Sequence, residues 1–222
     1  MTTALDLGCH SSAAEDDLFE AIASGLEQQG YVVLPAALPE TIAASLLDYL
    51  AVLEANRFHR AAVGRGNDQQ RNQFVRRDRI HWIEDDHQES GQWLAWSKRL
   101  QQYLNRRLFL GLFSFESHFS FYEAGDFYRK HLDAFRGESN RVLSLVTYLN
   151  KGWEPDQGGE LVIYTPDGAE EMLHVQPGYA TLVLFLSSEF PHEVKPTSRD
   201  RFAVAGWFRV NNSINDNIDP PR

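Results

Sequence analysis

Two histidines and an aspartate carry the most specific chemistry in the sequence. His131 and Asp133 lie two apart in a segment expected to be extended, where such side chains point to the same face. His192 follows after a β-rich stretch long enough to cross a sheet and return. Two histidines and one carboxylate on one face form the facial triad that binds non-haem Fe(II). We therefore expect these three residues to hold a divalent metal.

The His-x-Asp pair has little weight by itself. With 8 histidines in 222 residues, roughly one such pair in every two comparable sequences arises by chance. His87 precedes Gln88 and Glu89 with the same spacing, but in an acidic stretch without β periodicity. We interpret His87 as part of a solvated loop.

An arginine strengthens the set. Arg201 begins the apolar segment RFAVAGWF, and a turn over residues 196–200 separates it from His192, so the two are expected on neighbouring antiparallel strands. A planar guanidinium above small side chains suits the far carboxylate of a dicarboxylic acid. Tyr148 is in phase to add a phenol. The alternate residues of the second strand share one face: Arg201, Ala203, Ala205 and Trp207.

Helical patterns precede strand patterns along the chain. Apolar spacing predicts helices from Asp16, from Pro39 and over residues 92–108, whereas residues 112–210 alternate with period two between Gly/Pro turns. We expect an α+β fold, with N-terminal helices packed on a sandwich or jelly roll. The expected parts are a flexible N-terminus (1–15), one domain (16–210, helical over 16–110 and β over 112–210), a loop (60–73) and an irregular tail (211–222).

Composition excludes several classes of protein. One cysteine, Cys9, rules out a disulfide framework and multi-cysteine metal sites. The net charge of −10 disfavours a nucleic-acid binder, although arginines gather in residues 57–79. No uninterrupted apolar stretch is long enough for a membrane span, and the first residues do not resemble a signal peptide. A cytoplasmic location is the expectation.

At this level of detail the segment from about residue 121 to 208 resembles the 2-oxoglutarate- and Fe(II)-dependent oxygenases. Within them it is most similar to prolyl hydroxylases of the hypoxia-inducible-factor branch and their bacterial relatives. The phrases that carry the resemblance are FYEAGDFYRKHLD, RVLSLVTYLNKGW, GGELVIY and PHEVKPTSRDRFAVAGWF, with RRDRIHWIE upstream. The resemblance implies a double-stranded β-helix (jelly roll) core.

The resemblance also implies roles for individual residues. Fe(II) would be bound by His131, Asp133 and His192, and the C5 carboxylate of 2-oxoglutarate by Arg201 and Tyr148. Related enzymes that halogenate have a small residue where Asp133 stands, so the carboxylate here implies hydroxylation. The remaining implied positions line the cosubstrate pocket (Tyr122, Leu161, Val194, Trp207) or lie near the substrate (Arg141, Asp78, Trp82).

The function expected from the resemblance is hydroxylation of a prolyl residue in a protein, with O₂ consumed and succinate and CO₂ released. Elongation factor Tu is a candidate substrate, and ascorbate is a candidate reductant; no membrane or nucleic-acid partner is expected. Two alternatives stay open. One is the same chemistry on another side chain or a small metabolite, and the other is a non-enzymatic cupin-like binding module.

Overall fold

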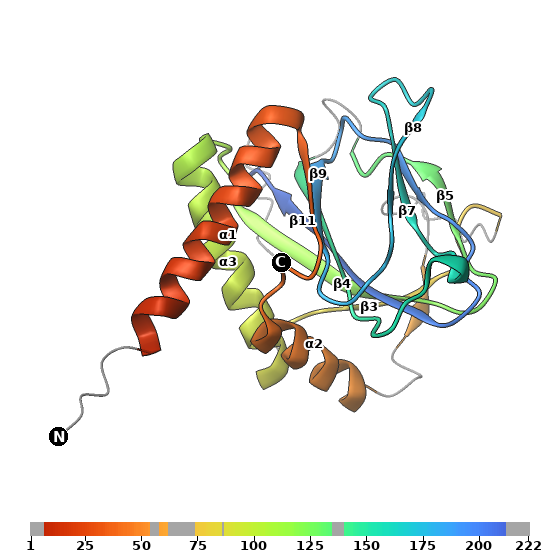
Figure 1. Ribbon diagram of the computed structural model, residues 1–222, viewed down its shortest axis with the longest axis horizontal. Helices are drawn as coiled ribbons and strands as arrows, with labels where there is room; N and C mark the ends of the chain where they lie inside the picture. The colour runs from red at the N-terminus through yellow and green to blue at the C-terminus, as the bar shows by residue number, and fades with distance from the viewer. Residues whose placement is uncertain (1–6, 54–57, 62–73, 86, 135–139, 212–222) are drawn as a thin grey trace, which may run out of the picture.

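The structure is a computed structural model that describes residues 7–53, 58–61, 74–85, 87–134 and 140–211. Three α-helices and a set of short strands alternate along the first half, and strands dominate the second half (Figure 1). In chain order the elements are α1 (Leu7–Gln29), β1 (Tyr31–Leu34), α2 (Glu40–Val52), β2 (His59–Arg60), β3 (Arg79–Trp82), α3 (Gln88–Leu108), β4 (Ser114–Tyr122), β5 (Tyr128–His131), β6 (Arg141–Tyr148), the 3-10 turn η3 (Pro155–Gln157), β7 (Leu161–Tyr164), β8 (Glu171–Val175), β9 (Leu182–Leu186), β10 (His192–Val194) and β11 (Arg201–Arg209).

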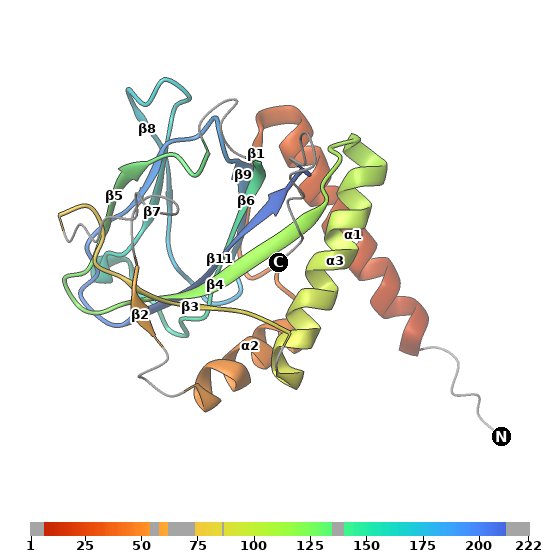
Figure 2. The same cartoon turned by 180° about the vertical axis from the view of Figure 1, so that it is seen from behind.

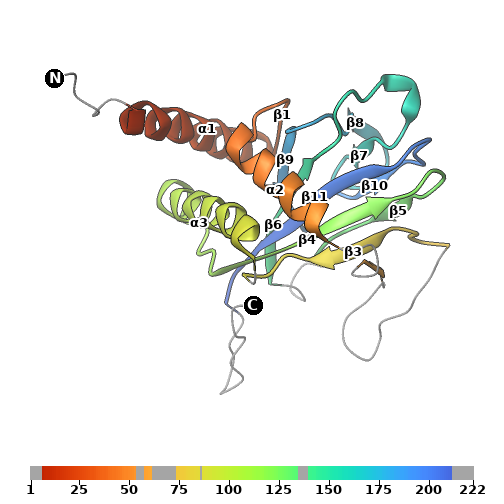
Figure 3. The ribbon, with the colours of Figure 1, turned by 90° about the horizontal axis from the view of Figure 1, so that it is seen from below.

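The strands form two facing sheets. The major sheet has seven strands in the order β1-β9-β6-β11-β4-β3-β2, and the minor sheet has four in the order β5-β10-β7-β8. All strand pairs within the sheets are antiparallel. The helices cover the outer face of the major sheet, and the minor sheet lies on its other side (Figure 3). This is the expected α+β architecture with a double-stranded β-helix core.

Successive side chains of a central strand point to opposite faces of the major sheet, and both of these faces are buried. On β9, Leu182 and Leu184 pack in the cluster that contains the helices, whereas Val183 and Phe185 pack in the cluster between the sheets. Strands covered on both faces read as continuous apolar runs rather than as an apolar–polar alternation. Each such side chain contributes roughly 1.5–3 kcal/mol by burial.

The helices pack through apolar stripes at helical spacing. Side chains of α3 are fully buried at every third or fourth position, and α1 lies alongside α3 from both viewing directions (Figures 1 and 2). The buried residues of these two helices are Trp93, Trp96, Leu100, Leu104, Phe19, Ile22, Ala23 and Leu26. The helical layer therefore leaves the inner face of the major sheet free to form a site.

Several boundaries differ from the sequence-based expectation. α1 begins at Leu7 rather than at Asp16, and Arg99 of α3 holds Glu15 through two hydrogen bonds of 2.6 and 2.9 Å. α3 begins at Gln88 rather than at residue 92, and the exposed His87 before it is its N-cap residue. The loop expected over residues 60–73 begins at the end of β2, and residues 62–73 lie outside the described part of the chain, as do 1–6 and 212–222.

Among the described residues, no helix combines the length and the apolar character that a membrane span requires.

Candidate active site between the two sheets

The three predicted metal ligands converge at one end of the minor sheet. His131 ends β5 and His192 begins β10, and the two are direct cross-strand partners. Asp133 lies just past β5, with its Oδ1 3.7 Å from Nε2 of His131 and its Oδ2 3.6 Å from Nε2 of His192. One ligand atom from each residue lies within 4.8 Å of the others.

Hydrogen bonds fix which nitrogen of each ring faces the centre. Nδ1 of His131 lies 2.8 Å from the carbonyl of Arg129, and Nδ1 of His192 lies 3.1 Å from the carbonyl of Phe190. Since a carbonyl only accepts, both Nδ1 atoms carry the proton and both Nε2 atoms present a lone pair. Two imidazole nitrogens and a carboxylate in this arrangement fit a divalent first-row metal.

The protonation states of His131 and Asp133 favour cation binding. Burial, and next the neighbouring His192, lower the pKa of His131 to about 3, so that the ring is neutral at neutral pH. Burial would raise the pKa of Asp133, but the two imidazoles and the Ser144 hydroxyl together hold it below its usual range. Metal binding therefore displaces no proton from His131 or Asp133 at neutral pH.

Arg201 is a buried cation without a carboxylate partner in the described part of the chain. Its side chain begins β11 at 1% exposure, and its Nε donates to the carbonyl of Gly159 at 2.8 Å. The guanidinium carbon lies 4.9 Å from the ring centre of Tyr122 and 5.1 Å from that of Tyr148. A buried charge is stable only when it is paired, so this site is suited to an anionic ligand.

A phenol completes the anion site. The hydroxyl of Tyr148 is buried and has no hydrogen-bond partner among the described residues. Burial raises the pKa of Tyr148 to about 12, against the opposing charge of Arg201. At neutral pH the group is therefore a free hydrogen-bond donor beside a guanidinium, as a bound carboxylate requires.

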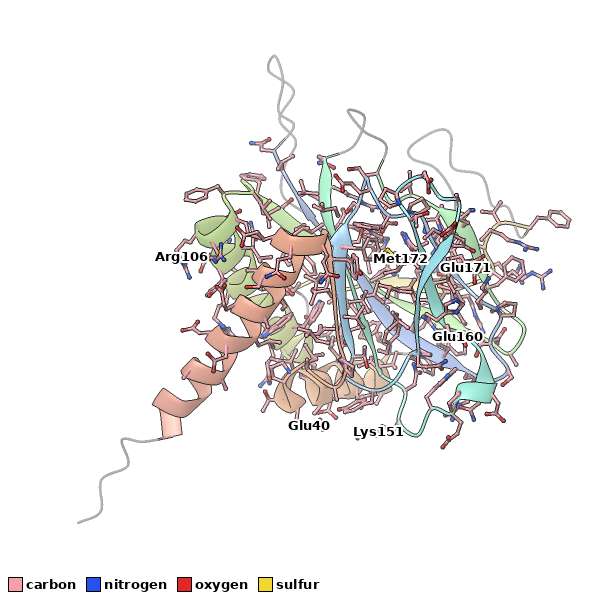
Figure 4. All side chains as sticks on the ribbon, turned by 45° about the horizontal axis from the view of Figure 1, so that its top comes forward. Glu40, Arg106, Lys151, Glu160, Glu171 and Met172 are labelled. Atoms are coloured by element: carbon pink, nitrogen blue, oxygen red, sulfur yellow. The ribbon has the colours of Figure 1, made fainter. Side chains whose placement is uncertain are left out.

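Most of the other predicted pocket residues line the same space. Tyr122 is the register partner of Arg201 on β4, and Leu161 and Val194 are cross-strand partners on β7 and β10. All three belong with Tyr148 to the apolar cluster between the sheets. Figure 4 shows the side chains that fill the space between the sheets, with Glu171 and Met172 marking β8.

A glycine lets Arg201 enter this space. Gly159 has a positive φ of 70°, and a Cβ there would lie 3.1 Å from Cδ of Arg201 and 3.2 Å from Thr197. Both the backbone conformation and the close approach require a residue without a side chain. The Gly-Gly turn of the sequence therefore positions the arginine.

Comparison with known proteins identifies the chemistry. The 2OG-Fe(II) oxygenase superfamily matches residues 117–209. A crystal structure of a Pseudomonas putida prolyl-4-hydroxylase is 36% identical and superposes with a TM-score of 0.77, covering 87% of this chain and 100% of that one. The chain belongs to the 2-oxoglutarate- and Fe(II)-dependent oxygenase superfamily. Its metal is Fe(II) and its cosubstrate is 2-oxoglutarate.

Other proteins share the fold of this oxygenase or part of its sequence. A prolyl hydroxylase from Trichoplax adhaerens, solved with a peptide fragment of the hypoxia-inducible factor, shares the fold with a TM-score of 0.78 at 23% identity, covering 90% of this chain and 92% of that one. Egl nine homolog 1 of Homo sapiens is 31% identical over 85 residues, which are 38% of this chain. The match spans only 20% of the human protein.

Two of the three predicted substrate residues of the oxygenase flank Trp207. Arg141 lies 3.6 Å over the Trp207 ring and is held there by Glu116 through hydrogen bonds of 3.0 and 2.7 Å. Trp82, which is 41% exposed, has its ring centre 6.4 Å from that of Trp207, and the ring of His118 contacts both indoles. The rings of Trp207, His118 and Trp82 form one aromatic wall, which extends from the buried Trp207 to the exposed Trp82.

The third residue, Asp78, is placed differently. It is 1% exposed and accepts two hydrogen bonds from Arg76, at 2.7 and 2.6 Å. Arg76 lies 4.3 Å over the ring of Tyr128, which stacks on His131 with ring centres 3.6 Å apart. Sequence reasoning missed Arg76 and Tyr128. The signal that could have found Arg76 is its spacing of two residues from Asp78, which puts both side chains on one face of an extended segment.

Replacing Asp78 by asparagine is expected to destabilise the fold. The change leaves the buried Arg76 without its counter-charge, a loss of about 3–5 kcal/mol. Thermal unfolding should show a drop of roughly 10 °C. The matched control is Glu123→Gln, which removes the exposed ion pair with Arg79 and should cost at most about 1 kcal/mol. Equal melting temperatures for Asp78→Asn and Glu123→Gln would contradict the prediction.

Proposed function

We propose that the protein is a prolyl hydroxylase that acts on a polypeptide. The observation that carries the proposal is the 36% identity to a prolyl-4-hydroxylase over the full length of that chain. The His131, Asp133 and His192 cluster supports it, since an intact carboxylate ligand goes with hydroxylation in this superfamily. When bound, Fe(II) with 2-oxoglutarate and O₂ supplies the oxidising chemistry that converts C–H into C–OH while succinate and CO₂ are released.

The residues of the chain bind and orient the reactants. His131, Asp133 and His192 hold the metal through two nitrogens and one carboxylate. Arg201 and Tyr148 would donate hydrogen bonds to the C5 carboxylate of 2-oxoglutarate and thereby bind and orient the cosubstrate. The apolar side chains between the sheets exclude water from this space: Tyr122, Leu161 and Val194.

The aromatic wall is the proposed contact for the proline ring. Trp207 is the register partner of Ser144, whose hydroxyl bonds Asp133, so that its indole lies beside the metal site. Trp82 continues the wall to the surface, where a polypeptide can pass. Flat indole faces suit the apolar edges of a pyrrolidine ring. Asp78 has a different proposed role: it holds Arg76 over the Tyr128 ring, which stacks on His131, and does not touch the substrate.

Elongation factor Tu is the proposed substrate, on the likeness to bacterial members of the family. The experiment incubates the protein with Fe(II), 2-oxoglutarate, ascorbate, O₂ and elongation factor Tu or a panel of proline peptides. Mass spectrometry should show a one-oxygen gain on proline, and succinate should appear with it. A peptide with alanine in place of the proline and a reaction without 2-oxoglutarate are the controls.

Variants separate the parts of the proposal. Trp82→Ala should lower oxygen gain on the peptide more than succinate release without peptide, whereas Phe109→Ala removes a ring that is 88% exposed on the helical side and should change neither. Succinate release without oxygen gain on any proline would refute prolyl hydroxylation and keep the oxygenase. Gain on peptides but not on elongation factor Tu would refute that substrate alone.

A further inference from the structure

Two serines form a buried hydrogen-bonded chain that ends on the metal-binding carboxylate. Ser144 Oγ lies 2.6 Å from Oδ2 of Asp133, and Ser187 Oγ lies 2.9 Å from Ser144 Oγ. Ser144 is 1% exposed and Ser187 is fully buried. The set of site residues expected from the sequence contains neither serine. This serine chain, from Ser187 through Ser144 to Asp133, therefore needs its own explanation.

Elementary valence fixes the direction of every bond in this chain. The hydroxyl of Ser144 donates to Oδ2 of Asp133 at 2.6 Å, because a carboxylate oxygen accepts. Ser144 has one proton and gives it to Asp133, so it offers Ser187 only lone pairs. Ser187 must therefore donate to Ser144. Each donor polarises the next, and the bond that reaches the carboxylate is strengthened.

The chain also joins the two sheets at the metal site. Ser144 lies on β6 in the middle of the major sheet, and Ser187 follows β9, the strand paired with β6. The backbone N–H of Ser187 donates to the carbonyl of Val142 at 3.0 Å, which holds it beside Ser144. Asp133 follows β5 of the other sheet, two residues past its end. Its side chain is thus anchored from a rigid element that it does not belong to.

We propose that Ser144, oriented by Ser187, is a positioning residue that sets the rotation of the Asp133 carboxylate for metal binding. With Oδ2 held by Ser144, Oδ1 faces Nε2 of His131 at 3.7 Å. A carboxylate that cannot rotate presents one preferred oxygen to the metal and loses little entropy on binding. The inference rests on the proposed role of Asp133 as a ligand, but not on the identity of the substrate.

The test compares variants that differ only in the hydroxyl. Ser144→Thr and Ser144→Val add the same bulk to β6, and only threonine retains a donor for Asp133. Calorimetric titration of the metal-free protein with Mn(II), a redox-stable stand-in for Fe(II), measures the affinity without any turnover. Ser144→Thr should bind Mn(II) within about threefold of wild type, and Ser144→Val should bind about 10–100-fold more weakly.

Ser187→Ala tests the direction of the chain. Ser144 keeps its proton for Asp133 in this variant, so the loss of Mn(II) affinity should be smaller than that of Ser144→Ala. Thermal melting of the metal-free variants controls for folding, and the visible spectrum of the Co(II)-loaded proteins reports the ligand geometry directly. The spectrum should shift in Ser144→Val and stay as in wild type in Ser144→Thr.

Two results would overturn the inference. One is a Ser144→Val variant that binds Mn(II) within threefold of Ser144→Thr, since the hydroxyl would then be irrelevant to the metal. The other is a larger loss in Ser187→Ala than in Ser144→Ala, which would reverse the order of the chain. Failure of the proposed hydroxylase activity leaves both measurements unaffected, because neither needs a substrate.

Discussion

Replacing His192 by alanine is expected to abolish tight Fe(II) binding. The ring carries one of the three proposed ligand atoms, and its Nε2 lies 3.6 Å from the carboxylate of Asp133. Loss of a group that only orients a ligand costs about 10–100-fold in metal affinity, so loss of a ligand itself should exceed that range. Anaerobic titration with Fe(II), followed by calorimetry, measures the change.

A second histidine provides the control for this experiment. His174 on β8 is paired with Glu171 at the surface, its side chain 51% exposed, and its replacement by alanine should leave Fe(II) affinity unchanged. Both variants should melt close to wild type when metal-free. Equal Fe(II) affinity in wild type and His192→Ala would show that the three residues are not the metal site.

Periodicity was sufficient to predict the fold class but not the sheet to which each strand belongs. The alternation of β4, β6 and β11 and the helical stripe from Trp93 to Leu104 were readable, because local burial follows local spacing. The expectation that His192 and Arg201 lie on neighbouring strands was wrong. β10 pairs with β5 and β7, whereas β11 pairs with β4 and β6, so the short turn between them crosses from one sheet to the other.

The residue types of the metal site were predictable from the sequence, but the strand pairing and the hydrogen bonds that hold them in place were not. His131 and His192 meet as cross-strand partners, which is a long-range pairing that spacing along the chain cannot reveal. The same holds for Ser144, which reaches Asp133 across the two sheets. Serine is common in strands and loops, so its type carries no signal until the fold brings it to a carboxylate.

Replacing Arg201 by alanine is expected to raise the KM for 2-oxoglutarate with little effect on Fe(II) affinity. Its guanidinium is the buried cation beside the Tyr148 hydroxyl, while the proposed metal ligands lie at the end of the opposing sheet. Two charge-assisted hydrogen bonds contribute roughly 3 kcal/mol or more, which corresponds to a KM increase of about 100-fold or more. Succinate release at varied 2-oxoglutarate concentrations measures it.

A cosubstrate lacking the distal carboxylate makes the test specific. Wild type should bind 2-oxopentanoate far more weakly than 2-oxoglutarate, and in Arg201→Ala that preference should vanish, because the group that distinguishes the two acids is gone. Arg199→Ala is the matched control. Arg199 is two residues before Arg201 in the sequence, but it is exposed and lies over the Trp153 ring, so its replacement should leave both KM values unchanged. A preference for 2-oxoglutarate that survives in Arg201→Ala would place the distal carboxylate elsewhere in the fold, so that the buried charge of Arg201 would have to be balanced by another anion.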